Sequence, residues 1–450
     1  MKYQSQKVAQ LYFVGALILF AAQITFGLLG ATLYVAPTSL PDFLPFNVIR
    51  MVHTNALVVW LLMGFFGATF YLLPEETESE LHSPFLAKLQ FWLFFIAAGI
   101  AVGGYLMGYS ADEGRSYLEQ PLPIKIGIVI VALMFLYNCS MTVLKGRKTV
   151  ISNILLLGLW GIAIFFLFAF YNPANIILDK MFWWWVVHLW VEGVWELVMA
   201  SILAFLVIKM TGVDREVVEK WLYVIIGLAL FTGILGTGHH YYWIGAPGYW
   251  KWIGSVFSAL EITPFFAMVI FTFMMVWKGG RDHPNKAALL WSLGCSVTAF
   301  FGAGVWGFLH TLAPINYYSH GTQVTAAHGH LAFYGAYAMI NLAMITYAMP
   351  QLKNRAPYNQ LLNIWSFWIT TAGVFFMTFA LTFAGVVQTH LQGVVGLSFM
   401  EAQEQLGLFY WLRLIGGIAT AVGVVLYIFS ILVPVGARAA SPAARIQPAE

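Results

Sequence analysis

Long apolar runs recur along the whole of this 450-residue chain, and they constrain its fold more than any other feature. A helix needs about 20 mostly apolar residues to cross a bilayer. A spanning strand would instead show an alternating pattern of about ten residues, which the sequence does not contain. The sequence therefore predicts an all-α membrane protein with residues 1–450 in a single integral-membrane domain. The twelve predicted helices cover 8–35, 50–73, 85–107, 122–144, 150–171, 182–210, 220–244, 252–278, 287–312, 322–349, 360–388 and 405–433.

The charged residues support the lipid bilayer as the surroundings of the chain. They make up only 9% of the sequence, against about 25% in a soluble domain. The net charge of +3 is too small to indicate a nucleic-acid partner. The two cysteines lie in apolar runs and the sequence has no C-x-x-C-H motif, so we expect no c-type haem on this chain.

The basic residues predict how the helices are oriented. If the N-terminus is cytoplasmic, 16 of the 22 Lys and Arg residues fall on the cytoplasmic side, as the positive-inside rule requires. An even number of spans returns the C-terminus to the same side, so both termini are predicted to be cytoplasmic. The outer side then keeps only Arg50, Arg115, Lys125, Lys180, Lys251 and Arg413.

Histidine is the residue type that indicates a function. Ionisable residues inside spans are costly and usually functional. One such histidine would be an ordinary hydrogen-bonded packing residue, but six of them at one depth, in the outer half of the membrane, predict metal binding. These six residues are His53, His188, His239, His240, His328 and His330.

The spacing of His328 and His330 indicates two cofactors. Two residues apart on a helix, they point roughly 200° away from one another and cannot bind one metal together. Their neighbours are small, which would let flat macrocycles approach the backbone, as expected of axial haem ligands. His53 is the natural partner for one of the pair, and the other haem would keep an open position for substrate.

The other three histidines suit a non-haem metal. His188 and Glu192 are four residues apart on one helix face, which brings a carboxylate beside the imidazole. Imidazole alone does not distinguish iron, copper and zinc, whereas an oxygen ligand favours iron over copper. Glu196 continues the same face one turn deeper, and Glu261 lies at the depth of the histidines, where we expect a role in proton transfer or in shaping the site.

The remaining histidines have weaker signals. His82 and His283 fall in charged loops and are expected to be solvated. His310, His320 and His390 lie near the outer surface, where hydrogen bonds to loops or to haem propionates are expected.

These motifs resemble the haem–copper oxidase superfamily, and its nitric oxide reductase branch in particular. The resemblance covers nearly the whole chain and is carried by His188-Leu-Trp-Val-Glu192-Gly-Val-Trp-Glu196, Gly238-His239-His240 and Ala327-His328-Gly329-His330. It implies that His53 and His330 bind a low-spin haem b and that His328 binds haem b3. It also implies that His188, His239, His240 and Glu192 bind a non-haem iron, with Glu196 and Glu261 close to the active site.

The same resemblance implies an activity, a location and partners. The expected reaction joins two nitric oxide molecules with two electrons and two protons to give nitrous oxide and water, in a bacterial inner membrane. A membrane-anchored cytochrome c subunit is the expected electron donor, because the quinol-dependent relatives carry a large N-terminal extension before the first span.

One departure from the family concerns calcium. Family members carry two glutamates before the fourth helix, associated with a calcium near the haem propionates. Glu119 matches one of them and is the residue expected to bind the ion, while Ser116 stands where the other is expected and Glu113 is the alternative carboxylate.

Two other functions fit parts of the pattern. An oxygen-reducing terminal oxidase would have the same fold, with copper in place of the non-haem iron. A twelve-span transporter would use the histidines and glutamates as proton relays, would contain no haem and would not need the pair of histidines two residues apart.

Overall fold

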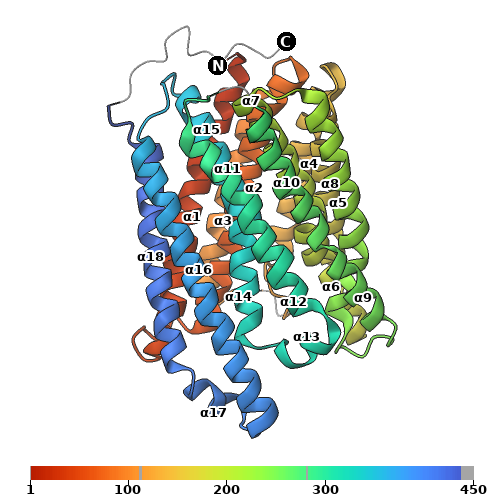
Figure 1. The fold of residues 1–450 in the computed structure, drawn as a ribbon, viewed down its shortest axis with the longest axis vertical. Coiled ribbons are helices and arrows are strands. Elements are labelled where there is room, and N and C mark those ends of the chain that lie inside the picture. Colours follow the sequence, from red (N-terminus) through yellow and green to blue (C-terminus); the bar gives the residue numbers. More distant parts are fainter. Residues whose placement is uncertain (1, 111–113, 280–281, 437–450) are drawn as a thin grey trace.

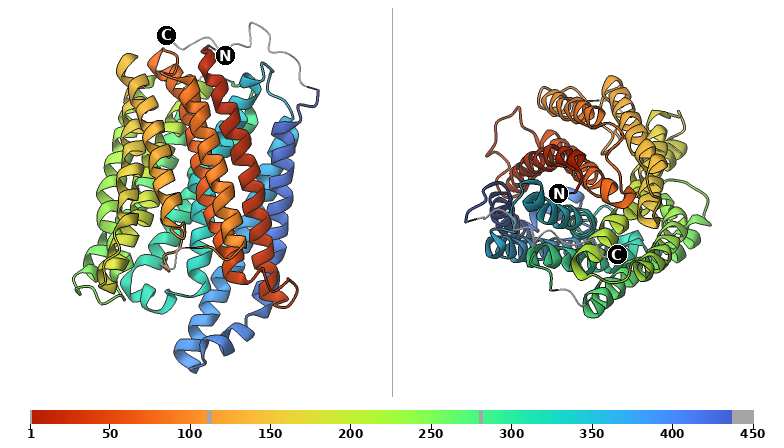
Figure 2. Two further views of the ribbon diagram at one scale, coloured as in Figure 1. Left: turned by 180° about the vertical axis from the view of Figure 1, so that it is seen from behind. Right: turned by 90° about the horizontal axis from the view of Figure 1, so that it is seen from above.

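A computed structural model describes residues 2–110, 114–279 and 282–436 of the chain. Within these residues, twelve helical segments are long and apolar enough to cross a membrane, which confirms the predicted all-α architecture of twelve spans. They stand side by side along one common direction (Figures 1 and 2). The N-terminal helix begins, and the C-terminal helix ends, at the upper end of Figure 1, as an even number of spans requires.

Seven spans are continuous helices or end in one short turn. They are α1 (Val8–Val35), which follows a 3-10 turn over Gln4–Lys7, α2 (Phe46–Thr77), α3 (Pro84–Leu106), α4 (Leu122–Lys145), α5 (Val150–Phe166), α16 (Gln360–His390) and α18 (Gly407–Leu432). A 3-10 turn over Leu167–Phe170 follows α5, and a π-helical turn over Leu391–Val395 follows α16.

In four of the other five spans the helix is interrupted, and in the fifth, α8 (Arg215–Gly236), it ends in the 3-10 turn that carries His239 and His240; together the five include every span after α2 that carries a candidate ligand. Their helices are α6 (Ile176–Leu189) with α7 (Trp195–Thr211), α8 (Arg215–Gly236) with a 3-10 turn over Thr237–Tyr241, α9 (Trp250–Leu260) with α10 (Ile262–Lys278), α11 (Lys286–Ala299) with α12 (Gly307–Thr311), and α14 (Gln323–Ala332) with α15 (Met339–Leu352). π-Helical turns join three of these pairs, at Trp190–Val194, Phe300–Trp306 and Phe333–Ala338. Such turns occur often at functional sites.

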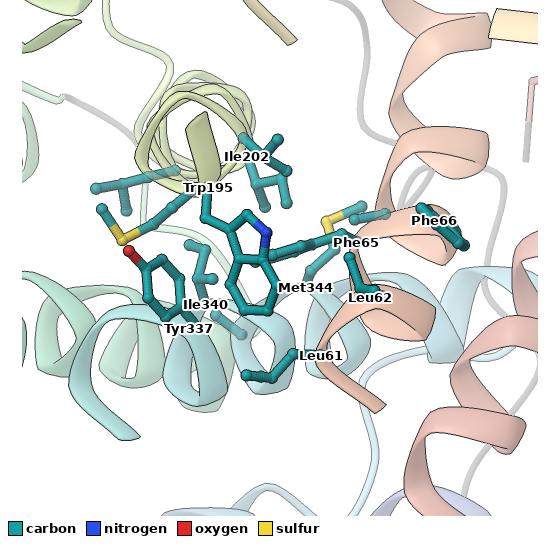
Figure 3. Close-up of a cluster of buried hydrophobic side chains, with 14 of the residues drawn as sticks. Leu61, Leu62, Phe65, Phe66, Trp195, Ile202, Tyr337, Ile340 and Met344 are labelled. Atoms are coloured by element: carbon teal, nitrogen blue, oxygen red, sulfur yellow. The ribbon is translucent and has the colours of Figure 1, made fainter. Parts of the chain in front are cut away.

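Three spans form the centre of the bundle. The apolar windows of Phe46–Thr77, Ile176–Thr211 and Gln323–Leu352 are 83%, 89% and 89% buried, while in each of the other nine spans half of the window or less is buried. Their contact is built around Trp195, whose ring meets Phe65 and Tyr337 edge-on at 5.4 and 5.3 Å between centroids (Figure 3). These central spans carry His53, His188, His328 and His330, so four of the six candidate histidine ligands lie on the most buried helices.

The two ends of the bundle differ in chemistry. At the end of the bundle where α2 ends, Glu76 is 1% exposed and accepts hydrogen bonds from both terminal nitrogens of Arg215, at 2.7 and 2.9 Å. At the lower end in Figure 1 lie the short helices α13 (Ala313–Ser319) and α17 (Phe399–Glu404), with the start of α14. We call the first the basic end and the second the histidine end.

The prediction of a solvated His283 is wrong, because this side chain is 3% exposed. Its Nδ1 accepts a hydrogen bond from the backbone N–H of Asn285, the residue that caps the start of α11. The cap turns the loop inward, and the His283 ring lies 5.9 Å from that of Tyr347.

Candidate haem and metal centre

Three imidazoles meet between α6 and the 3-10 turn that follows α8. The Nε2 atoms of His239 and His240 are 2.9 Å apart, and His240 Nε2 is 3.2 Å from Nδ1 of His188. His188 is fully buried and His239 is 8% exposed. The structure thus brings together the three histidines that the sequence assigned to one metal, and their ligand atoms all lie within 4.8 Å of one another.

Hydrogen bonds on the far side of two rings fix which nitrogen faces the cluster. His188 donates from Nε2 to the carbonyl of Gly233 at 2.8 Å, which leaves Nδ1 with its lone pair pointing inward. The Ser258 hydroxyl donates to the Gly236 carbonyl at 3.4 Å and accepts from Nδ1 of His239 at 2.7 Å, so Nε2 of His239 is unprotonated. Metal-binding histidines are held in this way by their second nitrogen.

This arrangement fits a metal ion. Lone pairs about 3 Å apart repel one another unless a cation or a proton lies between them, and bonds of about 2 Å from one metal bring imidazole nitrogens to such separations. The third ring, His240, is held by stacking on Trp184, with 3.6 Å between centroids and 8° between planes.

Carboxylates complete this cluster. Oε2 of Glu192 is 3.5 Å from Nδ1 of His188, and His188, Glu192 and Glu261 form a second group whose ligand atoms lie within 4.8 Å of one another. Glu192 does not follow a regular helix, since its φ of −114° and ψ of 32° fall in the π-helical turn between α6 and α7. Tyr337 donates a hydrogen bond to the carbonyl of Val191 and so holds this turn from α14–α15.

Glycines of α8 admit the two carboxylate residues to the cluster. A Cβ at Gly233 would collide with the backbone oxygen of Glu192, and one at Gly236 would collide with the carboxylate of Glu261. Glu261 sits at the junction of α9 and α10, and its Oε1 is buried with no hydrogen-bond partner among the described residues. Glu196 starts α7 one turn deeper and is 6% exposed.

His53 and His330 face one another across a second site. Their ring centroids are 6.2 Å apart with 30° between planes. His53 donates from Nδ1 to the Gln23 carbonyl at 2.8 Å, and His330 donates from Nδ1 to the Ala326 carbonyl at 2.7 Å, so each Nε2 is left unprotonated. Two metal–imidazole bonds of about 2 Å, added to the ring radii, account for a centroid separation of this size.

A cavity of about 490 Å³ surrounds this pair, and its walls fit a haem. The volume lies in the range of sites for cofactors of this size. Gly27 opens the wall beside His53, because a Cβ there would lie 2.8 Å from the ring. Arg413 also lines the cavity; its guanidinium lies 4.6 Å from the Tyr34 ring, and Nε and Nη1 are buried with no partner among the described residues. These donors are suited to haem propionates.

His328 belongs to the other face of α14. It donates from Nδ1 to the Gly302 carbonyl at 3.0 Å, and its ring touches the position where a Cβ of Gly307 would lie. His330 lines the cavity described above but His328 does not. The opposite orientations expected from a separation of two residues are therefore present. Its Nε2 is left as the ligand atom, which fits an axial haem ligand.

Neither Glu119 nor His310 belongs to the metal cluster, although the His310 ring lies 6.1 Å from that of His328. Glu119 accepts a hydrogen bond from Asn55 at 2.9 Å, in the connection between α3 and α4. His310 forms hydrogen bonds with the hydroxyls of Ser319 and Thr325, at 2.8 and 3.0 Å. These partners belong to the helices α13 and α14, not to a loop as expected.

Two contributors were not found from the sequence. Ser258 precedes Glu261 by three residues and shares its helix face, a signal too common to single it out. Arg413 was visible as a lone cation early in the twelfth span. Its relation to a haem cavity needs the packing of α18 against α1 and α16.

Comparison with known proteins defines the class. The family model for cytochrome c and quinol oxidase polypeptide I matches residues 7–419. The chain therefore belongs to this haem–copper oxidase family and is a multi-pass protein of the bacterial inner membrane. Within the family it is 58% identical to a nitric oxide reductase subunit of Stutzerimonas stutzeri, over 96% of this chain and 95% of the relative.

More distant relatives agree with the fold. The cbb3-type cytochrome c oxidase subunit CcoN1 of Stutzerimonas stutzeri is 24% identical over 83% of this chain and 82% of its own length. A heme-copper terminal oxidase dimer solved by cryo-EM superimposes with a TM-score of 0.74 at 15% identity, covering 95% of this chain and 83% of that one. The much higher identity to the nitric oxide reductase subunit separates this chain from the oxygen-reducing relatives.

Proposed function

We propose that this chain is a nitric oxide reductase that converts two nitric oxide molecules, two electrons and two protons to nitrous oxide and water. The 58% identity to a nitric oxide reductase subunit supports this activity over oxygen reduction. The observation that carries it is the carboxylate of Glu192, 3.5 Å from Nδ1 of His188 inside a cluster of three imidazoles. An oxygen ligand beside the histidines favours iron over copper.

Each group of residues has one cofactor in this proposal. His188, His239, His240 and Glu192 hold a non-haem iron, His328 holds haem b3, and His53 and His330 hold a low-spin haem b. When bound, haem b3 and the iron supply two neighbouring metals at which two substrate molecules can be held and reduced.

The protein's own part is to hold the ligands rigidly and to deliver protons. The carbonyl of Gly233 and the hydroxyl of Ser258 keep His188 and His239 oriented toward one point, so little reorganisation is needed during turnover. The unpartnered Oε1 of Glu261 can carry a proton next to the cluster, and Glu196 supplies a second buried carboxyl one turn deeper.

Electrons reach the pair His53/His330 first, by this proposal, from a membrane-anchored cytochrome c subunit that docks on the histidine end. One of the two helices that carry the pair also connects it to the catalytic side, since His328 and His330 share α14. A donor subunit is supported by the relative's description as one subunit of its enzyme.

The test is an anaerobic assay of the purified complex, with haem, iron and copper quantified in the same sample. We expect nitric oxide consumption, two b-type haems for each chain and additional iron that is not in haem. Copper in place of that iron, with oxygen consumption and no nitric oxide turnover, would support an oxidase instead. The lack of any haem absorption would support a transporter.

A further inference from the structure

The loop between α3 and α4 is where the family's calcium is expected, and its oxygen atoms can be examined one by one. Calcium takes six to eight oxygen ligands, with carboxylates prominent among them. In this sequence Glu119 is the single matching carboxylate, because Ser116 replaces the second glutamate. The alternative, Glu113, lies outside the described residues.

Glu119 has only one oxygen to offer. Its Oε2 accepts a hydrogen bond from the Asn55 amide at 2.9 Å. Its Oε1 is buried, has no hydrogen-bond partner among the described residues and lies 3.8 Å from Nη2 of Arg50. The nearest charge to this oxygen is therefore a guanidinium that approaches without reaching hydrogen-bond distance.

Three other oxygens of the loop already accept hydrogen bonds, whereas Oε1 of Gln120 is buried with no partner among the described residues. Both terminal nitrogens of Arg50 donate to the Ser116 hydroxyl at 3.3 Å. The Ser116 carbonyl accepts from the Trp183 indole at 3.1 Å, and the Tyr117 carbonyl accepts from the Gln120 amide at 3.1 Å. Among the described residues, both groups of side chains arranged for a metal contain His188, and neither contains Glu119.

Electrostatics points the same way. Burial raises the pKa of Glu119, and the hydrogen bond from Asn55 and the charge of Arg50 offset this only in part. A divalent ion bound here would need the ionised carboxylate and would also lie next to the positive charge of Arg50, which costs free energy.

We propose that the guanidinium of Arg50 is the resident cation of this loop, and that the chain binds no calcium at Glu119. Ser116 contributes to this replacement of calcium by Arg50. Its hydroxyl accepts hydrogen bonds from both terminal nitrogens of Arg50, and a glutamate with a bound calcium would displace them. Arg50 lies on α2 three residues before His53 and lines the haem cavity, so the same charge also faces the site proposed for the low-spin haem. The inference depends on membership of the haem–copper oxidase family and on these contacts, and it is the same whether the chain reduces nitric oxide or oxygen.

The test measures calcium, haem and non-haem iron in one sample of the purified complex, before and after treatment with EGTA. We expect calcium far below one ion for each chain, and neither EGTA nor added calcium chloride should change the melting temperature or the reduced haem spectrum. Calcium that is stoichiometric with the chain, or a spectral shift on chelation, would overturn the proposal. Missing haem would instead count against the proposed function, so the two failures can be told apart.

Variants of Arg50 test the first part of the proposal, that its guanidinium is the cation of this loop. Arg50→Gln removes the charge and should lower the melting temperature and shift the low-spin haem spectrum, while Arg50→Lys keeps the charge and should change both less. Arg147→Gln is the control, since Arg147 pairs with Glu78 at 2.7 Å on the exposed basic end and should leave the haem spectrum unchanged. A spectrum and a melting temperature of Arg50→Gln equal to those of the unaltered complex would contradict the role of Arg50.

Discussion

The two histidine sites are built from different kinds of backbone. His53 and His330 lie within continuous stretches of α2 and α14, and a single large cavity surrounds them. The cluster of His188, His239 and His240 lies where helices are interrupted, beside the π-helical turn that carries Glu192 and within the 3-10 turn after α8. Carboxyl groups are part of the cluster, whereas the His53/His330 pair has the cations Arg50 and Arg413 in its cavity wall.

This difference matches the chemistry proposed for each site. Passing an electron requires two fixed axial ligands and little else, and regular helices supply them. Joining two substrate molecules and adding protons requires ligands and acids from several elements aimed at one point, which irregular turns allow. The two sites should therefore be separable by mutation.

The largest effects should come from removing one ligand at each site in turn. His188→Ala should lower nitric oxide turnover by at least about 100-fold, above the range for residues that only orient ligands, and leave the low-spin haem spectrum in place. His53→Ala should remove that spectrum and retain the non-haem iron. Optical spectra and metal quantification of both variants provide the check, and loss of both centres in either variant would contradict their independence.

A smaller effect is expected from the hydroxyl that orients His239. Ser258→Ala removes the group that holds Nδ1, so iron affinity or turnover should fall by about 10- to 100-fold while the ligands remain. Ser201→Ala is the matched control, because this buried hydroxyl donates only to the Leu197 carbonyl of its own helix, α7, and not to a histidine. Equal turnover in the two variants would show that Ser258 does not orient the cluster.

The smallest change in turnover is expected at the cavity of the pair. Arg413→Gln removes a cation that favours the reduced haem, so the midpoint potential of the low-spin haem should decrease, with turnover reduced only a few-fold. Arg413→Lys should restore much of the potential. A redox titration followed at the low-spin haem band measures this, and an unchanged potential would remove Arg413 from the haem site.

The repeated apolar runs were enough to predict the twelve spans, because each run must satisfy its own backbone in lipid. The opposite orientations of His328 and His330 could likewise be predicted, because they follow from helix geometry alone. The approach of His188 to His239 and His240 was expected only from depth and from resemblance, and the distances come from the structure.

Other features could not be read from the sequence. Glu192 was expected on a regular helix face, but a π-helical turn presents it, and that turn depends on Tyr337 from another span. The nitrogen that each histidine exposes depends on backbone carbonyls such as those of Gly233 and Gly302, which carry no sequence signal. His283 was misjudged for a related reason, since its loop is folded inward by the cap at Asn285.

The most direct measurement is anaerobic nitric oxide turnover by the Glu192→Ala complex, recorded together with its low-spin haem spectrum. Turnover should be abolished and the spectrum of the haem between His53 and His330 should stay intact. Turnover equal to that of the unaltered complex would contradict the assignment of Glu192 to the metal, and with it the choice of iron and of nitric oxide.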